Sequence, residues 1–171
     1  VFVVSEVVVP EHPVTAWLAL LACGFHGIRL VRWKGWSVVS EPLLWVLHLG
    51  YAWLVVALLL IGVAGLTDVV PETAALHALT VGAFGTMILA GMTRTALGHT
   101  GRALTASPAT TVIFILITIA ACLRVAAPFL EEQSLTVIWL SALSWFAAFA
   151  WYLVVYIPVL TRLRVRTAGT S

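Results

Sequence analysis

The chain has 171 residues, of which 62 % are hydrophobic and only 9 % are charged, and its formal net charge is +2. Soluble domains carry about 25 % charged residues. The composition therefore excludes a water-soluble fold, whose surface would need more charge than this chain contains. We predict an all-α, polytopic membrane protein. The lipid bilayer is its expected partner, and no nucleic-acid partner is expected.

The two cysteines, Cys23 and Cys122, both lie inside apolar runs. There is no CxxC pair and no CxxCH sequence, so neither a disulfide framework nor a covalently attached c-type haem is indicated. The chain starts at Val1, and its first residues do not resemble a signal peptide. We expect it to be the C-terminal part of a longer protein, forming a single membrane domain here.

Five apolar runs follow one another along the chain, and each can cross a hydrocarbon core of about 30 Å as a helix. The runs are continuous rather than alternating, which favours helices over the strands of a barrel. Prolines at the starts of several runs suit the first helical turn. The expected spans cover residues of about 14–31, 42–64, 72–92, 108–127 and 135–160.

Charged residues separate between the two sides of this five-span topology. One side holds eight of the nine basic residues: Arg29, Arg32, Lys34, Arg94, Arg102, Arg162, Arg164 and Arg166. The other side holds six of the seven acids: Glu6, Glu11, Asp68, Glu72, Glu131 and Glu132. By the positive-inside rule the basic side is cytoplasmic. We therefore expect the N-terminus outside and the C-terminus inside.

Histidine is the candidate ligand of this chain, since imidazole suits haem iron, copper and zinc. The topology places His26, His48 and His99 at similar depths near the cytoplasmic side, and His77 and His12 near the opposite side. We predict a metal or haem site at one or both depths. The alternative is that each histidine only forms a hydrogen bond between helices.

Arg124 is the one basic residue inside a span. It either extends to the outer surface, toward Glu131 or Glu132, or pairs with an anionic cofactor group such as a haem propionate. Ala78, Gly82 and Gly85 fall on nearly one face of the third span. This pattern favours a close helix–helix contact, and a flat cofactor against the groove is the alternative.

The stretch from Thr93 to Arg102 is the most specific feature, and we predict that it is a polar loop. Gly98 and Gly101 bracket His99 and Thr100, which predicts a tight turn with exposed backbone donors. Arg94 and Arg102 add two cations. A membrane anchor needs only charge, so this pattern indicates a binding role.

The sequence HALTVGAFGTMILAGMTRTALGHTGR, which runs from His77 to Arg102, closely resembles the signature of the NnrS family of bacterial membrane proteins. The upstream segment LLWVLHLGYAWL, from Leu43 to Leu54, resembles a second family segment. The resemblance covers most of residues 40–160. The positions that match the family pattern are His48, Tyr51, His77, Arg94, Gly98, His99, Gly101 and Arg102.

The resemblance implies a multi-pass protein of the bacterial inner membrane with about twelve spans, of which this chain is roughly the C-terminal half, and it implies that the protein contains haem and copper. It also implies a link to nitric oxide metabolism, denitrification or resistance to nitrosative stress. The candidate metal ligands are His26, His48, His77 and His99. The other candidate cofactor contacts are Tyr51, Arg94, Arg102 and Arg124. Ligands contributed by the N-terminal half would complete these sites.

Two other functions stay open at this point. A transporter or channel without a redox cofactor would line its path with polar residues of the spans, but the chain has few intramembrane acids and no paired, broken helices. A redox enzyme similar to the haem-copper oxidases would use a denser set of histidines than this chain holds. Whether the protein is an enzyme is left open.

Overall fold

The computed structural model describes residues 13–163, and within them every regular element is helical. Five helices are long and apolar enough to span a membrane, which confirms the predicted fold class. His12 and the acids Glu6 and Glu11 lie outside the described residues, as do Arg164 and Arg166. The helical elements are α2 (Pro13–Arg32), η1 (Gly35–Val38), α3 (Pro42–Ala64), α4 (Glu72–His77), η2 (Ala78–Gly85), α5 (Thr86–His99), α6 (Pro108–Ala126), η3 (Ala127–Phe129) and α7 (Ser134–Thr161).

The third span consists of three segments, α4, η2 and α5, that follow one another without a break from Glu72 to His99. Its middle segment, η2, is a π-helix, in which the backbone hydrogen bonds span one residue more than in an α-helix. Helix starts follow the expected chemistry. Pro42 and Pro108 stand in the first turns of their helices, and the Ser107 side chain caps α6 by accepting from the Thr110 amide at 3.2 Å.

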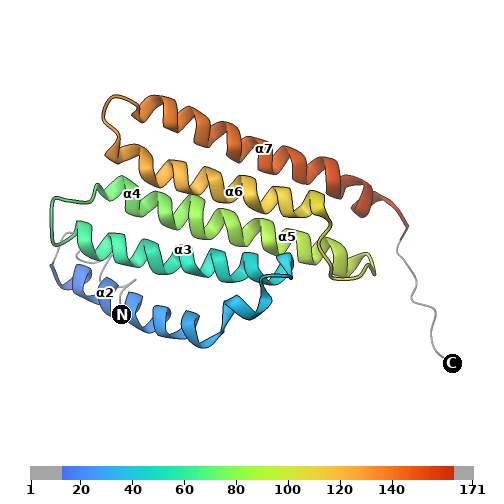
Figure 1. Ribbon diagram of the computed structural model, residues 1–171, viewed down its shortest axis with the longest axis horizontal. Coiled ribbons are helices and arrows are strands. Elements are labelled where there is room, and N and C mark those ends of the chain that lie inside the picture. The colour runs from blue at the N-terminus through green and yellow to red at the C-terminus, as the bar shows by residue number, and fades with distance from the viewer. Residues whose placement is uncertain (1–12, 164–171) are drawn as a thin grey trace.

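The spans lie side by side in chain order, each antiparallel to the next (Figure 1). The connections between spans therefore alternate between the two ends of the helix bundle. We call the basic end the one where α2, α5 and α7 finish, and the acidic end the one that holds Asp68, Glu72, Glu131 and Glu132. The predicted separation of charges between the two sides is thus present among the described residues. Which end faces the cytoplasm stays a prediction.

The main cluster of buried apolar residues lies in the half of the helix bundle nearer the basic end. A cluster of buried residues there joins α3, α5, α6 and α7: Leu43, Val46, Leu89, Ala90, Ala96, Leu97, Ile113, Phe114, Ile117, Ala148, Tyr152 and Tyr156. Two α7 serines reinforce the contact, because Ser141 and Ser144 donate to α6 carbonyls at 2.7 and 2.8 Å. The outer faces of α2 and α7 expose large apolar side chains such as Phe25 and Phe146, as suits contact with lipid.

Small residues in the third span make a close helix–helix contact, as predicted. A Cβ built on Gly82 would lie 2.6 Å from Cδ2 of Trp53 on α3. Gly85 faces α6, where a Cβ would lie 3.4 Å from Cδ1 of Ile117. The indole of Trp53 therefore covers the face that the alternative prediction reserved for a flat cofactor.

We expect Gly82→Ala to lower the free energy of unfolding by about 1–3 kcal/mol, because the new methyl group overlaps the indole of Trp53 and not the end of a flexible chain. Gly91→Ala is the matched control in the same span, since a Cβ there meets nothing within 4 Å. It should change stability by less than about 1 kcal/mol, in the stabilising direction. Unfolding titrations with SDS in mixed micelles would measure both, and equal losses would contradict the packing argument.

Candidate functional site

A cluster of aromatic and basic side chains joins α2 to α3 near the basic end. His26 Nδ1 and the Tyr51 hydroxyl share a hydrogen bond of 2.5 Å. The ring of Trp33 contacts two other members: its centroid lies 4.7 Å from the ring centroid of Tyr51 and 5.9 Å from that of His48. The Arg29 guanidinium lies 4.9 Å from the Trp33 ring centroid, within the range of a cation–π contact. Two imidazoles and a phenol from facing helices thus belong to one cluster.

The ring of His48 has a defined orientation within this cluster. Its Nδ1 lies 2.9 Å from the carbonyl oxygen of Leu44, one turn earlier on α3. A carbonyl can only accept, so Nδ1 carries the hydrogen and a neutral ring keeps its lone pair on Nε2. Gly35 of η1 packs against the same ring, because a Cβ there would lie 2.9 Å from His48 Cδ2. Both contacts hold the imidazole in one position.

The segment Thr93–His99 is helical, which corrects the prediction that the polar loop begins at residue 93. Helix α5 continues because the less polar members of the segment face the core. Thr93, Ala96 and Leu97 are buried, and the last two belong to the main cluster of buried residues. His99 is therefore the last residue of the helix, and the loop begins after it.

Gly101 ends this helix. It has φ of 71°, the left-handed conformation that glycine adopts without strain. The Gly101 amide donates to the Gly98 carbonyl at 3.1 Å, and the Arg102 amide donates to the Leu97 carbonyl at 3.0 Å. These two bonds form a Schellman motif. The predicted tight turn is present, but the amides of residues 101 and 102 serve the helix end.

Arg94 and Arg102 each reach a backbone carbonyl far away in the sequence. Arg94 Nη1 donates to Leu43 O on α3 at 3.3 Å, and Arg102 Nη1 donates to Val159 O on α7 at 3.0 Å. The last carbonyls of a helix lack partners within the helix, so Arg102 satisfies one of them near the end of α7. The two arginines therefore tie α5 and its loop to α3 and α7, with further N–H groups left for a ligand.

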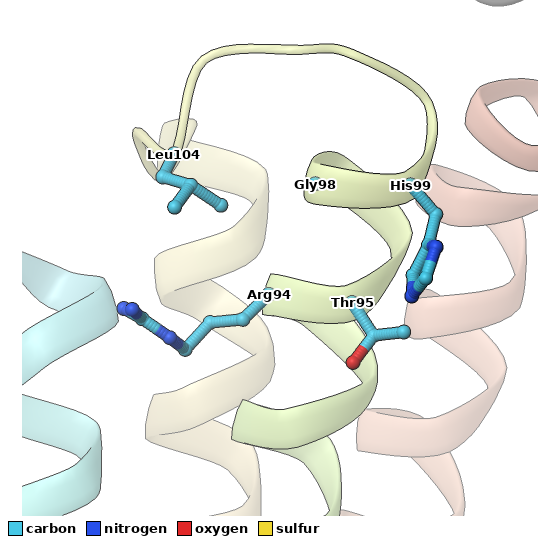
Figure 2. A pocket seen from close by; sticks show the side chains of 5 residues that line it. All are labelled: Arg94, Thr95, Gly98, His99 and Leu104. Atoms are coloured by element: carbon cyan, nitrogen blue, oxygen red, sulfur yellow. The ribbon is translucent and has the colours of Figure 1, made fainter.

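A cavity of about 370 Å³ lies beside the end of α5, lined by Arg94, Thr95, Gly98, His99 and Leu104. Figure 2 shows that Arg94 extends from α5 toward α3, whereas Thr95 and His99 point to the other side of the helix. The cavity thus combines an imidazole, a guanidinium and a hydroxyl, but the imidazole and the guanidinium do not point at each other.

Arg102→Ala should lower the free energy of unfolding by about 1–3 kcal/mol, because the Val159 carbonyl loses a charged donor. Arg162→Ala is the matched control, since that side chain is exposed at the end of α7. It should cost less than about 0.5 kcal/mol. Thermal unfolding in detergent would compare the two, and an equal loss would rule out the tie between the loop and α7.

At the acidic end, His77 and Arg124 form a direct contact between the third span and α6. Arg124 Nε donates to His77 Nε2 at 3.1 Å. The guanidinium is always a donor, so the lone pair of His77 Nε2 is engaged by Arg124. The observed partner of Arg124 is thus the imidazole of His77. A cavity of about 290 Å³ opens beside the pair, and neither Glu131 nor Glu132 lines it.

The histidines of the described residues are divided among three places. His26 and His48 belong to the cluster between α2 and α3, His99 lies at the end of α5, and His77 lies at the acidic end. The described part of the chain contains no group of three or more His, Cys, Asp or Glu side chains placed to hold one metal ion. His26, His48 and His99 therefore do not form a three-ligand site by themselves.

Comparison with known families agrees with this architecture. The family model described as NnrS protein matches residues 1–164. The chain belongs to the NnrS family. No curated protein and no solved structure matches the chain.

Within this NnrS protein, the sequence analysis missed the residues that orient the candidates. Arg29 and Trp33 stand one turn apart at the end of α2, and that spacing could have indicated a shared contact. Leu44 and His48 have the same spacing. The packing of Gly35 against His48 left no signal in the sequence, because it depends on how the connection between α2 and α3 folds back.

Proposed function

We propose that this NnrS-family protein binds haem and copper within the bacterial inner membrane and acts in nitric oxide metabolism or in resistance to nitrosative stress. The basic end would face the cytoplasm. The family resemblance supports the pair of cofactors. The arrangement around His48 supports the presence of a metal ligand.

The observation that carries the proposal is the hydrogen bond from His48 Nδ1 to the Leu44 carbonyl. Histidines that bind metals commonly donate their other ring hydrogen to a backbone carbonyl or a carboxylate, which fixes the tautomer and the ring orientation. His48 has this arrangement, and its Nε2 lone pair is the free one. His26 and Tyr51 in the same cluster add a second imidazole and a phenol oxygen, which are donors that copper accepts.

We place the copper ion in the cluster at the basic end. His48 would bind it through Nε2, and His26, which forms a hydrogen bond with Tyr51, is the second candidate ligand of the same cluster. Since the described residues hold no group of three such ligands, further ligands would come from outside them. Copper at this place would supply a redox-active ion that accepts or donates one electron.

We place the haem at the end of α5. His99 would bind the iron, and Arg102 would face a carboxylate with the N–H groups that the Val159 carbonyl leaves free. Arg94 extends to the other side of α5 and would face a carboxylate there. The iron of a bound haem would supply a binding position for nitric oxide.

The test is optical and metal analysis of the full-length protein purified in detergent. We expect a Soret band, bound copper by mass spectrometry, and a shift of the Soret band when nitric oxide is added to the reduced protein. Absence of both cofactors after expression with added haem precursor and copper would overturn the proposal. Saturable solute flux in cofactor-free liposomes would then favour the transporter.

A further inference from the structure

The His77–Arg124 pair is chemically unlike the other candidate sites, because its imidazole has already used the nitrogen lone pair that a metal would need. Arg124 Nε holds that lone pair at 3.1 Å. A metal ion bound to His77 Nε2 would have to displace a guanidinium and would be repelled by its charge. With Nε2 as the acceptor, the other ring nitrogen of a neutral His77 is a donor. Both residues are therefore prepared to donate hydrogen bonds.

The cavity beside this pair carries the matching chemistry. It is lined by Thr73, His77, Arg124, Ala127, Pro128, Ser134 and Ile138. Two hydroxyls, an imidazole and a guanidinium thus share one space of about 290 Å³. No carboxylate of the described residues lines it, although Glu72, Glu131 and Glu132 are close in the sequence. Within this cavity the positive charge of Arg124 therefore has no carboxylate partner from the described residues and is available to a ligand.

Two further features favour a negative charge at this place. Ser134 is the first residue of α7, a helix of 28 residues whose N-terminal end carries a partial positive charge. The remaining walls are apolar, since Ala127, Pro128 and Ile138 contribute them. In apolar surroundings a charged hydrogen bond is stronger than in water, and an uncompensated arginine is costly.

We propose that the His77–Arg124 cavity is a binding site for a carboxylate, with Arg124 as the charged donor and His77 as the residue that positions it. Because Nε is occupied by His77, the two Nη groups form the fork that binds both oxygens of a carboxylate. Thr73 and Ser134 supply neutral hydroxyl donors at the cavity wall. The site does not depend on haem. A free small carboxylate and a carboxylate of a bound haem have the same chemistry here.

The test uses the full-length protein in phosphatidylcholine nanodiscs, with sodium acetate as the probe and sodium chloride to hold the ionic strength constant. The thermal midpoint, followed by tryptophan fluorescence, should rise with acetate and saturate. Arg124→Gln should raise the half-saturating acetate concentration at least tenfold. Arg124→Lys should retain part of the response. No saturable rise in the wild type, or the same rise in Arg124→Gln, would overturn the site.

A second set of variants leaves Arg124 in place and covers the case in which Arg124→Gln fails to fold. Ser134→Ala and Thr73→Val should each weaken the acetate response several-fold, and Thr136→Val on the same helix, outside the cavity, should leave it unchanged. His77→Ala should weaken the acetate response. His77→Gln restores an acceptor for Arg124 Nε and should recover the response. Equal responses in all these variants would contradict the assignment.

The source of the carboxylate is decided by comparing haem-free and haem-loaded protein. If the natural occupant is a haem carboxylate, acetate should act only on the haem-free form. If it is a free carboxylate, acetate should act equally on both forms. Either result supports the site. A protein that binds acetate but no haem would contradict the proposed cofactor and leave the carboxylate site standing.

Discussion

His48→Ala is expected to lower the affinity of the full-length protein for copper at least tenfold. The reason is geometric: Nδ1 donates to the Leu44 carbonyl, so Nε2 is left as the only nitrogen that can bind a metal, and Gly35 packs against the ring from the side. Removing the imidazole removes the ligand that is best oriented in the cluster. The measurement is copper content after dialysis against a competing chelator, with haem content measured in parallel.

Two further variants separate loss of the ligand from loss of the fold. Gly35→Ala keeps the imidazole but pushes on its Cδ2, so it should weaken copper binding by less than His48→Ala does. Gly24→Ala is the matched control, because a Cβ at Gly24 on α2 meets nothing within 4 Å, and it should retain copper. Full retention of copper by a folded His48→Ala protein would exclude His48 as a ligand.

Phe114→Ala should give the largest loss of stability, about 2–3 kcal/mol in the free energy of unfolding. Phe114 is fully buried in the cluster between α3, α5, α6 and α7 and meets Trp45 edge to face, with 6.0 Å between ring centroids. Buried Phe→Ala changes in soluble proteins cost about 3–5 kcal/mol. In a membrane the water-transfer part is absent, because lipid is as apolar as the core, so mainly the cost of the cavity remains.

Phe146→Ala is the control for this prediction, since Phe146 lies on the outer face of α7 and is 66 % exposed. Its loss leaves no internal cavity and should cost less than about 0.5 kcal/mol. Unfolding titrations of both variants in the same lipid–detergent mixture would give the difference. If the two substitutions lower the free energy of unfolding equally, the packing of the buried cluster near the basic end would not be a source of stability.

Much of the fold could be predicted from the sequence, and the third span shows where prediction stopped. Its apolar part, from Glu72, is predictable because each apolar residue adds a favourable transfer free energy to the insertion of the helix. The end of the helix was placed too early, at residue 92, because Arg94, Thr95 and His99 look like loop residues. The structure extends the helix because Ala96 and Leu97 are buried and Arg94 reaches the Leu43 carbonyl.

The candidate site was predicted less completely than the fold. His77 and Arg124 fall near the same end of adjacent spans in the sequence, and the structure joins them with a hydrogen bond across 47 positions. The roles of Gly98, His99 and Gly101 were harder to separate. Gly101 ends the helix through its left-handed conformation, whereas His99 lines a cavity beside the end of α5.

The sequence by itself determined the number of spans, their order and the separation of basic from acidic ends. These follow from the composition of each segment, because a helix in lipid satisfies its own backbone and needs no partner to form. Only the tertiary structure decided which polar side chains meet. Lipid and protein core are equally apolar, so hydropathy does not mark the face of a span that packs inward. The links from Arg94 to Leu43, Arg102 to Val159 and Arg124 to His77 depend on the rotation and register of neighbouring helices.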